Sequence, residues 1–210
     1  MITAELIDYI EAEILPRYDA FDKGHRRDHA LTVIEQSLEL AGHYSVNHDI
    51  VYAAAAYHDT GLCEGRELHH MVSARIVRED KRLREFFSPK EIDIIADAVE
   101  DHRASNSTPP RTIYGRIVAE ADRIIAPGTI ITRTIQYGLA HYPTLTKKEH
   151  LERAVQHLKE KYGRGGYLKL WIPESDNAKN LQQFRTFIDD TKGLRNRLEE
   201  IYKEVTASVI

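Results

Sequence analysis

Histidine and aspartate side chains that could hold a metal ion are spread along the first two thirds of the chain. The sequence has 11 histidines in 210 residues, and the pair His58-Asp59 ends its most apolar stretch. An ionised carboxylate beside a buried segment costs free energy unless a cation or hydrogen-bond donors compensate it. Imidazole nitrogen and carboxylate oxygen together suit a divalent metal ion. The alternative is a histidine that completes a helix and an aspartate that caps the next turn, and the pair alone leaves both interpretations open.

Other candidate ligands lie on different predicted helices or helix ends. His29 lies on the apolar side of its segment, where it could also be a hydrogen-bonded core residue. Asp122 lies at the margin of a later apolar stripe, and His102 extends another. His69 opens a segment, with His70 beside it as a competitor. A helical bundle can bring such side chains together at one site in its core.

The elements that must position these side chains are predicted to be helices. Apolar residues recur at helical spacing, no segment alternates as a strand would, and only 11 Gly and 7 Pro interrupt the chain. Capping-box patterns stand at Ser88–Glu91 and Thr146–Glu149. The helices are expected at about 2–14, 25–43, 49–57, 69–82, 88–99, 117–125, 127–140, 146–162 and 177–205.

We therefore predict an all-α fold, a single-domain helical bundle spanning residues 1–210. The candidate ligands fall within a core of about 20–140. Residues 141–210 are expected to form a helical C-terminal extension. Within it, the basic stretch from Lys147 to Lys169 is predicted to be a solvated helix and loop.

Composition excludes several classes of protein. With 29 Lys and Arg against 33 Asp and Glu, the net charge is −4, which argues against a stable nucleic-acid partner or an anionic-membrane binder. The single Cys63 excludes a disulfide framework and a cysteine-rich zinc site. The longest apolar run, 50–57, is too short to cross a bilayer, and four acidic residues within the first 13 are unlike a signal peptide. A cytoplasmic protein without a membrane partner is expected.

Four local motifs occur in a distinctive order, with the sequences GHRRDHALTV at 24–33, AAYHDTG at 55–61, HHMVSA at 69–74 and EADRIIAPGTIITR at 120–133. Their order and flanks resemble the HD-domain phosphohydrolase superfamily, and in particular its small stand-alone bacterial hydrolases. The resemblance implies an all-α bundle of the HD-domain type. The sequence departs from the family pattern at Ile125, where Asp is usual, and at Ile131, where a second Gly is usual.

The resemblance implies a metal site with the ligand order H…HD…D, made by His29, His58, Asp59 and Asp122. Mn²⁺ is the expected ion, with Fe²⁺, Ni²⁺ or Mg²⁺ as alternatives. Such an ion lowers the pKa of a bound water molecule and neutralises phosphate charge. The implied reaction is the hydrolysis of a nucleotide or another small phosphoester.

Catalytic and substrate-binding residues are assigned alongside the metal ligands. His69 and His102 are expected to be catalytic, either by completing a second metal position or by binding phosphate and protonating the leaving group. His25, Arg26 and Arg133 are expected to bind the substrate. The expected partner is a small phosphorylated substrate, and a homo-oligomer is left open.

Two other functions stay open at this stage. A non-hydrolytic ligand-binding or signalling domain of HD descent is one, although such domains typically lose the metal residues. A di-iron oxygenase on a similar helical bundle is the other, and it requires both His69 and His102 as ligands.

Overall fold

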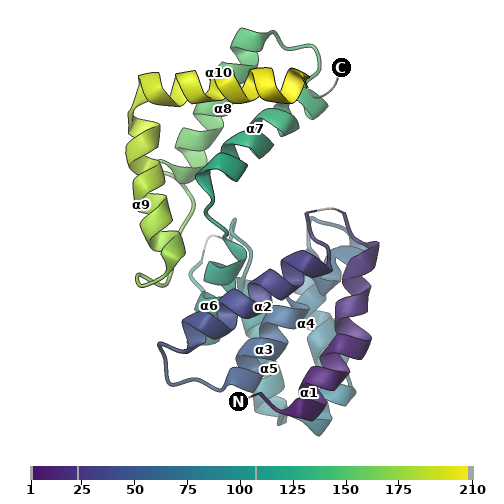
Figure 1. The fold of residues 1–210 in the computed structure, drawn as a ribbon. Helices are drawn as coiled ribbons and strands as arrows, with labels where there is room; N and C mark the ends of the chain where they lie inside the picture. Colours follow the sequence, from purple (N-terminus) through teal and green to yellow (C-terminus); the bar gives the residue numbers. More distant parts are fainter. Residues whose placement is uncertain (1, 23, 107, 208–210) are drawn as a thin grey trace. The chain divides into compact units, whose positions relative to one another are not determined.

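The computed structural model describes residues 2–22, 24–106 and 108–207, and these ranges contain ten α-helices and no strand (Figure 1). The prediction of an all-α fold is confirmed. The α-helices are Ala4–Tyr9 (α1), Arg27–Ala41 (α2), His48–Tyr57 (α3), His69–Glu79 (α4), Pro89–Asp101 (α5), Ile113–Asp122 (α6), Pro127–His141 (α7), Lys147–Tyr162 (α8), Asp176–Asp189 (α9) and Thr191–Ala207 (α10).

The chain folds into two compact units. The first runs as far as Arg123 and also takes in Leu170–Ile172, and the second contains Ile124–Lys169 and the chain from Pro173 onward. The expectation of one domain over residues 1–210 stays a prediction. The structure places the division at Ile124, earlier than the expected start of the C-terminal extension at residue 141.

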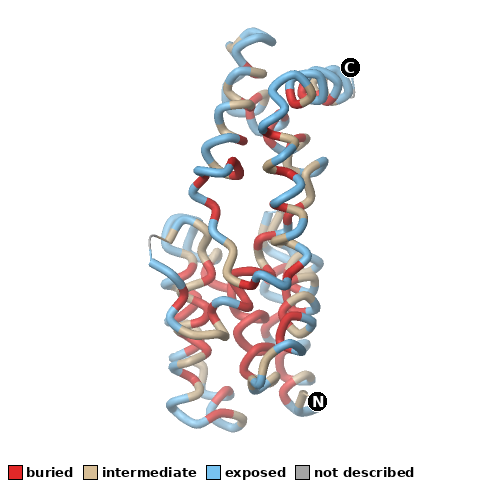
Figure 2. Tube along the Cα trace, turned by 90° about the vertical axis from the view of Figure 1, so that its left-hand side faces the viewer, coloured by how far each residue is buried: buried red, intermediate tan, exposed pale blue. Residues whose placement is uncertain are grey.

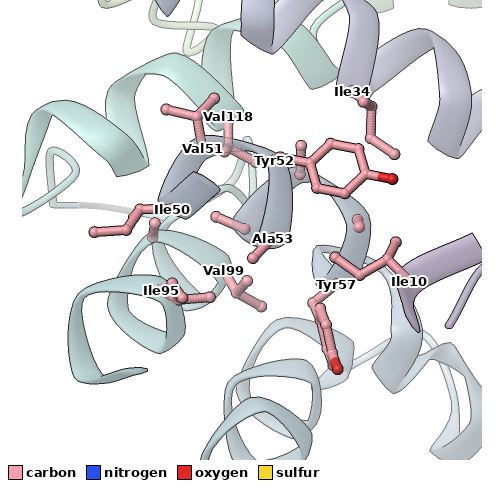
Figure 3. Close-up of a cluster of buried hydrophobic side chains, with 14 of the residues drawn as sticks. Ile10, Ile34, Ile50, Val51, Tyr52, Ala53, Tyr57, Ile95, Val99 and Val118 are labelled. Atoms are coloured by element: carbon pink, nitrogen blue, oxygen red, sulfur yellow. The ribbon is translucent and has the colours of Figure 1, made fainter. Parts of the chain in front are cut away.

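Helix α3 forms the centre of the first unit. All its residues from Ile50 to Tyr57 are buried, as its nearly continuous apolar sequence requires. Helices α2, α5 and α6 pack against it, and its side chains meet theirs in one cluster (Figure 3). Figure 2 shows buried residues gathered in the interior of the unit that carries the N-terminus. A helix so enclosed holds the turn that follows it, His58-Asp59, at a fixed place.

Two of the predicted helices are divided in the structure. The segment expected at 2–14 is α1 followed by a π-helix, Ile10–Ile14, and a 3-10 helix, Leu15–Ala20, continues beyond it. The segment expected at 177–205 is α9 and α10, separated at Asp190. The Asp190 side chain accepts a hydrogen bond from the Gly193 N–H at 3.0 Å and so caps a new helix, which competes with continuing the old one.

Helix α6 ends at Asp122, three residues before the apolar pattern ends. Arg123 has a non-helical backbone, and the chain there leaves the first unit. Two residues before Asp122, the fully buried carboxylate of Glu120 accepts hydrogen bonds from the backbone N–H groups of Trp171, at 2.7 Å, and Ile172, at 3.4 Å. Three residues from far along the chain are thereby fixed to the helix that carries Asp122.

Replacing Glu120 by alanine should lower the free energy of unfolding by about 2–4 kcal/mol, because the backbone N–H groups of Trp171 and Ile172 lose a buried, charged acceptor. Urea denaturation measures this, and limited proteolysis should show faster cleavage near 170–172. Glu39→Ala, at an exposed position of α2, is the matched control and should change stability by less than about 0.5 kcal/mol. Equal urea midpoints for both variants would contradict the anchoring role.

The second unit consists of α7, α8, α9 and α10. Arg153 of α8 donates a hydrogen bond to the Thr134 carbonyl of α7 and lies between the rings of Tyr137 and Tyr142. Gly138 allows this approach, since a Cβ there would lie 2.5 Å from an Arg153 nitrogen. Within the described ranges, every helix of either unit is too short or too polar to span a lipid bilayer.

Candidate metal centre

The turn after α3 presents His58 and Asp59. The Nδ1 of His58 donates a hydrogen bond to the Ala55 carbonyl at 2.8 Å, which directs Nε2 away from the helix. The His58 side chain is fully buried and Asp59 is 4% exposed. A neutral imidazole held through one nitrogen by a carbonyl offers the lone pair of the other nitrogen to a cation.

Tyr18, from the 3-10 helix Leu15–Ala20, fixes this turn. Its buried hydroxyl donates to the Ala56 carbonyl at 2.9 Å and accepts from the Asp59 N–H at 3.2 Å. Its ring packs at a tilt against His58, with the centroids 6.2 Å apart. No sequence pattern indicates this role, because a tyrosine in an apolar helix is usually a core residue.

His29, His58, Asp59 and Asp122 converge from three segments of the first unit. The Nε2 of His29 lies 3.3 Å from the Nε2 of His58 and 3.2 Å from Asp122 Oδ1. Asp59 Oδ2 lies 3.4 Å from the His58 Nε2 and 3.8 Å from the His29 Nε2. Ligands bound at about 2.1 Å to one ion stand about 3–3.5 Å apart, so these separations suit a shared cation.

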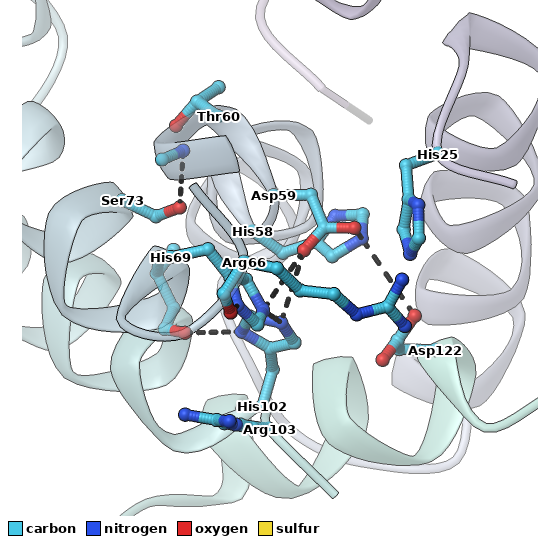
Figure 4. A network of polar contacts seen from close by, with 12 residues as sticks. His25, His58, Asp59, Thr60, Arg66, His69, Ser73, His102, Arg103 and Asp122 are labelled. Atoms are coloured by element: carbon cyan, nitrogen blue, oxygen red, sulfur yellow. Dashed lines mark hydrogen bonds and ion pairs between the residues drawn. The ribbon is translucent and has the colours of Figure 1, made fainter. Parts of the chain in front are cut away.

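A second group uses the other oxygen of Asp59. Asp59 Oδ1 lies 3.3 Å from the Nε2 of His69 and 3.4 Å from the Nε2 of His102, and these two nitrogens are 3.3 Å apart. His69 donates through Nδ1 to the Arg66 carbonyl, and His102 does so to the Val99 carbonyl. Figure 4 shows both rings directed at Asp59. The Asp59 carboxylate therefore lies between two groups that could each hold a metal ion.

Residues 26–126 match the family model of the HD domain. The protein contains an HD domain. The resemblance to the HD-domain superfamily is thereby confirmed, and the matched segment runs from the start of α2 to just beyond α6. No curated protein and no solved structure matches the chain. HD domains bind divalent metals and are commonly phosphohydrolases, and the donor atoms gathered around Asp59 fit such ions.

Gly61 allows α4 to pack against the turn that carries His58 and Asp59. Its N–H donates to the Ser73 Oγ at 2.7 Å, and a Cβ at this position would lie 2.2 Å from the His69 carbonyl oxygen. Only glycine allows so close an approach, and the approach places His69 rather than His70 beside Asp59. Backbone packing therefore decides that His69, and not His70, faces the cluster.

His25 lies at the edge of the first group. Its Nδ1 contacts the Asp22 carboxylate at 2.8 Å, and its ring meets the His29 ring edge-on with the centroids 5.9 Å apart. Partial burial would raise the pKa of Asp22, but the Gly24 N–H, His25 and the charge of Arg66 lower it below its usual value. Asp22 thereby orients His25 from outside the matched HD segment.

The arginines of the sequence motifs at 24–33 and 120–133 have different surroundings. Arg26 is exposed immediately before α2, while Arg27 is paired with Asp19. Arg123, next to Asp122, is 7% exposed and folds back to the Ala119 carbonyl. Arg133 is exposed on α7 in the second unit. The substrate-binding roles of His25, Arg26 and Arg133 stay predictions.

Strong electrostatic coupling links the carboxylates to His58 in the absence of metal. Burial alone would lower the pKa of His58, but Asp59 and Asp122 outweigh it and raise the pKa to about 9. Burial alone would raise the pKa of Asp122, but His29, His58 and His102 lower it to about 2. The pKa of Asp59 lies well below its usual range because His58 and His102 outweigh the effect of its desolvation. A cation at this cluster is therefore favoured, whether it is a proton or a metal ion.

The stability of the metal-free protein should fall as the pH rises from 6.5 to about 9. A raised folded-state pKa contributes stability that is complete below the ordinary value of 6.5 and is lost as the pH passes about 9. The expected loss is on the order of 3 kcal/mol, measured by urea denaturation in a chelator at several pH values. Metal-loaded protein is the control, because a bound ion replaces the proton and flattens the dependence. Equal pH dependence of both forms would contradict the coupling.

Proposed function

We propose that the protein is a metal-dependent phosphohydrolase that acts on a nucleotide or another small phosphoester. The observation that carries the proposal is the position of Asp59, with one oxygen toward His29 and His58 and the other toward His69 and His102. Three of these histidines donate through Nδ1 to backbone carbonyls, so their Nε2 atoms can act as ligands.

The residues assigned to a first divalent ion are His29, His58, Asp59 and Asp122, and those assigned to a second are Asp59, His69 and His102. Divalent ions supply Lewis-acid activation of water and neutralise phosphate charge. Mn²⁺ is proposed, with Fe²⁺, Ni²⁺ or Mg²⁺ as alternatives, because the donor set holds nitrogen and oxygen but no sulfur.

The charge of the cluster selects the class of substrate. Neutral histidines with two carboxylates carry a charge of −2, so two divalent ions leave a net positive site that favours an anion. His25, oriented by Asp22, presents its free ring edge at the rim of the first group. With both ring nitrogens protonated, His25 is proposed to donate from Nδ1 to Asp22 and from Nε2 to a phosphate oxygen of the substrate.

A panel of nucleotides and simple phosphoesters tests the proposal, with phosphate and pyrophosphate release read separately. The protein is stripped with a chelator and reloaded with Mn²⁺ before each assay. Hydrolysis that needs the metal and is lost in Asp122→Ala supports the proposed function. Absence of release from every compound by the reloaded parent protein would refute it.

His69→Ala and His102→Ala should each reduce the metal content from two ions to one and lower activity by about 10²–10⁴. Each substitution removes one nitrogen from the three-residue group around Asp59 Oδ1. Elemental analysis after dialysis gives the stoichiometry. His70→Ala is the matched control, because its ring lies outside both ligand groups. Unchanged metal content with reduced activity would assign acid–base or phosphate-binding roles to His69 and His102 instead.

A di-iron oxygenase is the second candidate, and the group formed by Asp59, His69 and His102 favours it because that reaction needs a second iron site. The two candidates differ in their need for oxygen. Hydrolysis by Mn²⁺-loaded protein without oxygen supports the phosphohydrolase, whereas oxygen consumption by the iron-loaded protein alone supports the oxygenase. The complete ligand set argues against a non-hydrolytic signalling domain.

A further inference from the structure

The loop between Asp59 and α4 carries an arginine that the motifs did not indicate. After the 3-10 helix Thr60–Glu64, Gly65 has a φ of 106°, the one positive φ among the described residues. Nothing lies within 4 Å of a Cβ built there, so the backbone conformation alone calls for glycine. The turn it makes brings Arg66 to the edge of the metal-ligand cluster.

Three hydrogen bonds hold this loop in place. The Gly65 N–H donates to the Leu62 carbonyl at 3.0 Å, His69 Nδ1 donates to the Arg66 carbonyl at 2.8 Å, and Arg103 donates to the Glu67 carbonyl. The backbone of Arg66 is thus tied directly to a candidate metal ligand. Its side chain starts from a fixed point rather than from a loosely held loop.

The Arg66 side chain is exposed, and in the view of Figure 4 it extends across the front of the cluster toward His25 and Asp122. Its positive charge acts on the carboxylate of Asp22, the residue that orients His25. Within the described part of the chain, its guanidinium forms no hydrogen bond or ion pair. The neighbouring arginines differ, since Arg103 is bound to a carbonyl and Arg27 to a carboxylate.

We propose that Arg66 binds a second phosphate of the substrate, next to the phosphate held at the Asp59 cluster. This inference rests on the proposed function. The guanidinium forms no ion pair within 4 Å with Asp59 or Asp122, so its N–H groups are available to an anion beside the cluster. A guanidinium offers five N–H donors in a planar fork that matches two phosphate oxygens. The preferred substrate class is then a compound with adjacent phosphates, such as a nucleoside diphosphate or triphosphate.

Calorimetric titration of the Mn²⁺-loaded full chain tests this without requiring turnover. The probes are orthophosphate and methylenediphosphonate, a non-hydrolysable diphosphate, with metal content measured before and after. Arg66→Ala should weaken the binding of methylenediphosphonate by about tenfold to a hundredfold and that of orthophosphate by less than about threefold. Arg66→Lys keeps the charge but not the planar fork. Its affinity for methylenediphosphonate should lie between that of the parent and that of Arg66→Ala.

Arg116→Ala, at an exposed position of α6, is the matched control and should bind both probes as the parent does. Equal weakening of both probes in Arg66→Ala, no weakening, or loss of metal would each overturn the proposal. A parent that binds neither probe also overturns it. A parent that binds methylenediphosphonate through Arg66 but cleaves no phosphoester refutes the proposed function while the anion site stands.

Discussion

Asp59→Asn should reduce bound metal to less than about a tenth of the parent's content and lower hydrolytic activity by about 10³ or more. The two oxygens of Asp59 face two different ligand groups, so one substitution weakens both. Asparagine keeps one oxygen, but it replaces the other with an N–H₂ group that repels a cation and carries no negative charge. Elemental analysis after dialysis against metal-free buffer measures the effect.

Asp122→Asn is the informative comparison, because Asp122 contacts only the group formed with His29 and His58. It should lose one ion where Asp59→Asn loses both. Asp93→Asn, an exposed carboxylate of α5, controls for the change in net charge and should keep the parent's metal content. If Asp59→Asn stays as metal-loaded as the parent, Asp59 does not join the two groups.

The grouping of the candidate ligands could largely be predicted, because these residues lie in or at the ends of strongly patterned helices. The apolar sequence of α3 predicts burial all round, and burial makes an ionised Asp59 costly unless a cation is near. The capping box at Ser88 likewise places the start of α5, and with it the position of His102 thirteen residues after Pro89. Local signals of this kind depend only on neighbours in the sequence.

The contacts made across long separations were not predictable from one sequence. Tyr18 reaches the backbone of Asp59 from a 3-10 helix, and Trp171 reaches Glu120 from beyond the matched HD segment. Nothing local distinguishes these residues from an ordinary core tyrosine or a loop tryptophan. The role of Arg66 depends on the positive φ of Gly65, and a glycine in a polar loop can signal many different turns.

Gly61→Ala should destabilise the protein by about 3 kcal/mol or more, because the two atoms that the new methyl group would approach most closely belong to the backbone. Its Cβ would lie 2.2 Å from the His69 carbonyl oxygen and 2.5 Å from the Ser73 nitrogen. Neither atom can move without shifting the start of α4. Urea denaturation of the metal-free protein measures the loss. Gly128→Ala in α7, where nothing lies within 4 Å, is the matched control and should be neutral or slightly stabilising.

The same substitution connects stability to the metal centre. Relief of the clash requires α4 to move away from the turn, and His69 must move with it, because its carbonyl is the atom that the methyl group strikes. The Nε2 of His69 would then leave Asp59 Oδ1, while His29, His58 and Asp122 belong to segments that the clash does not touch. Folded Gly61→Ala should therefore bind one ion where the parent binds two. Two ions in a variant as stable as the parent would show that the approach of α4 to the turn does not set the position of His69.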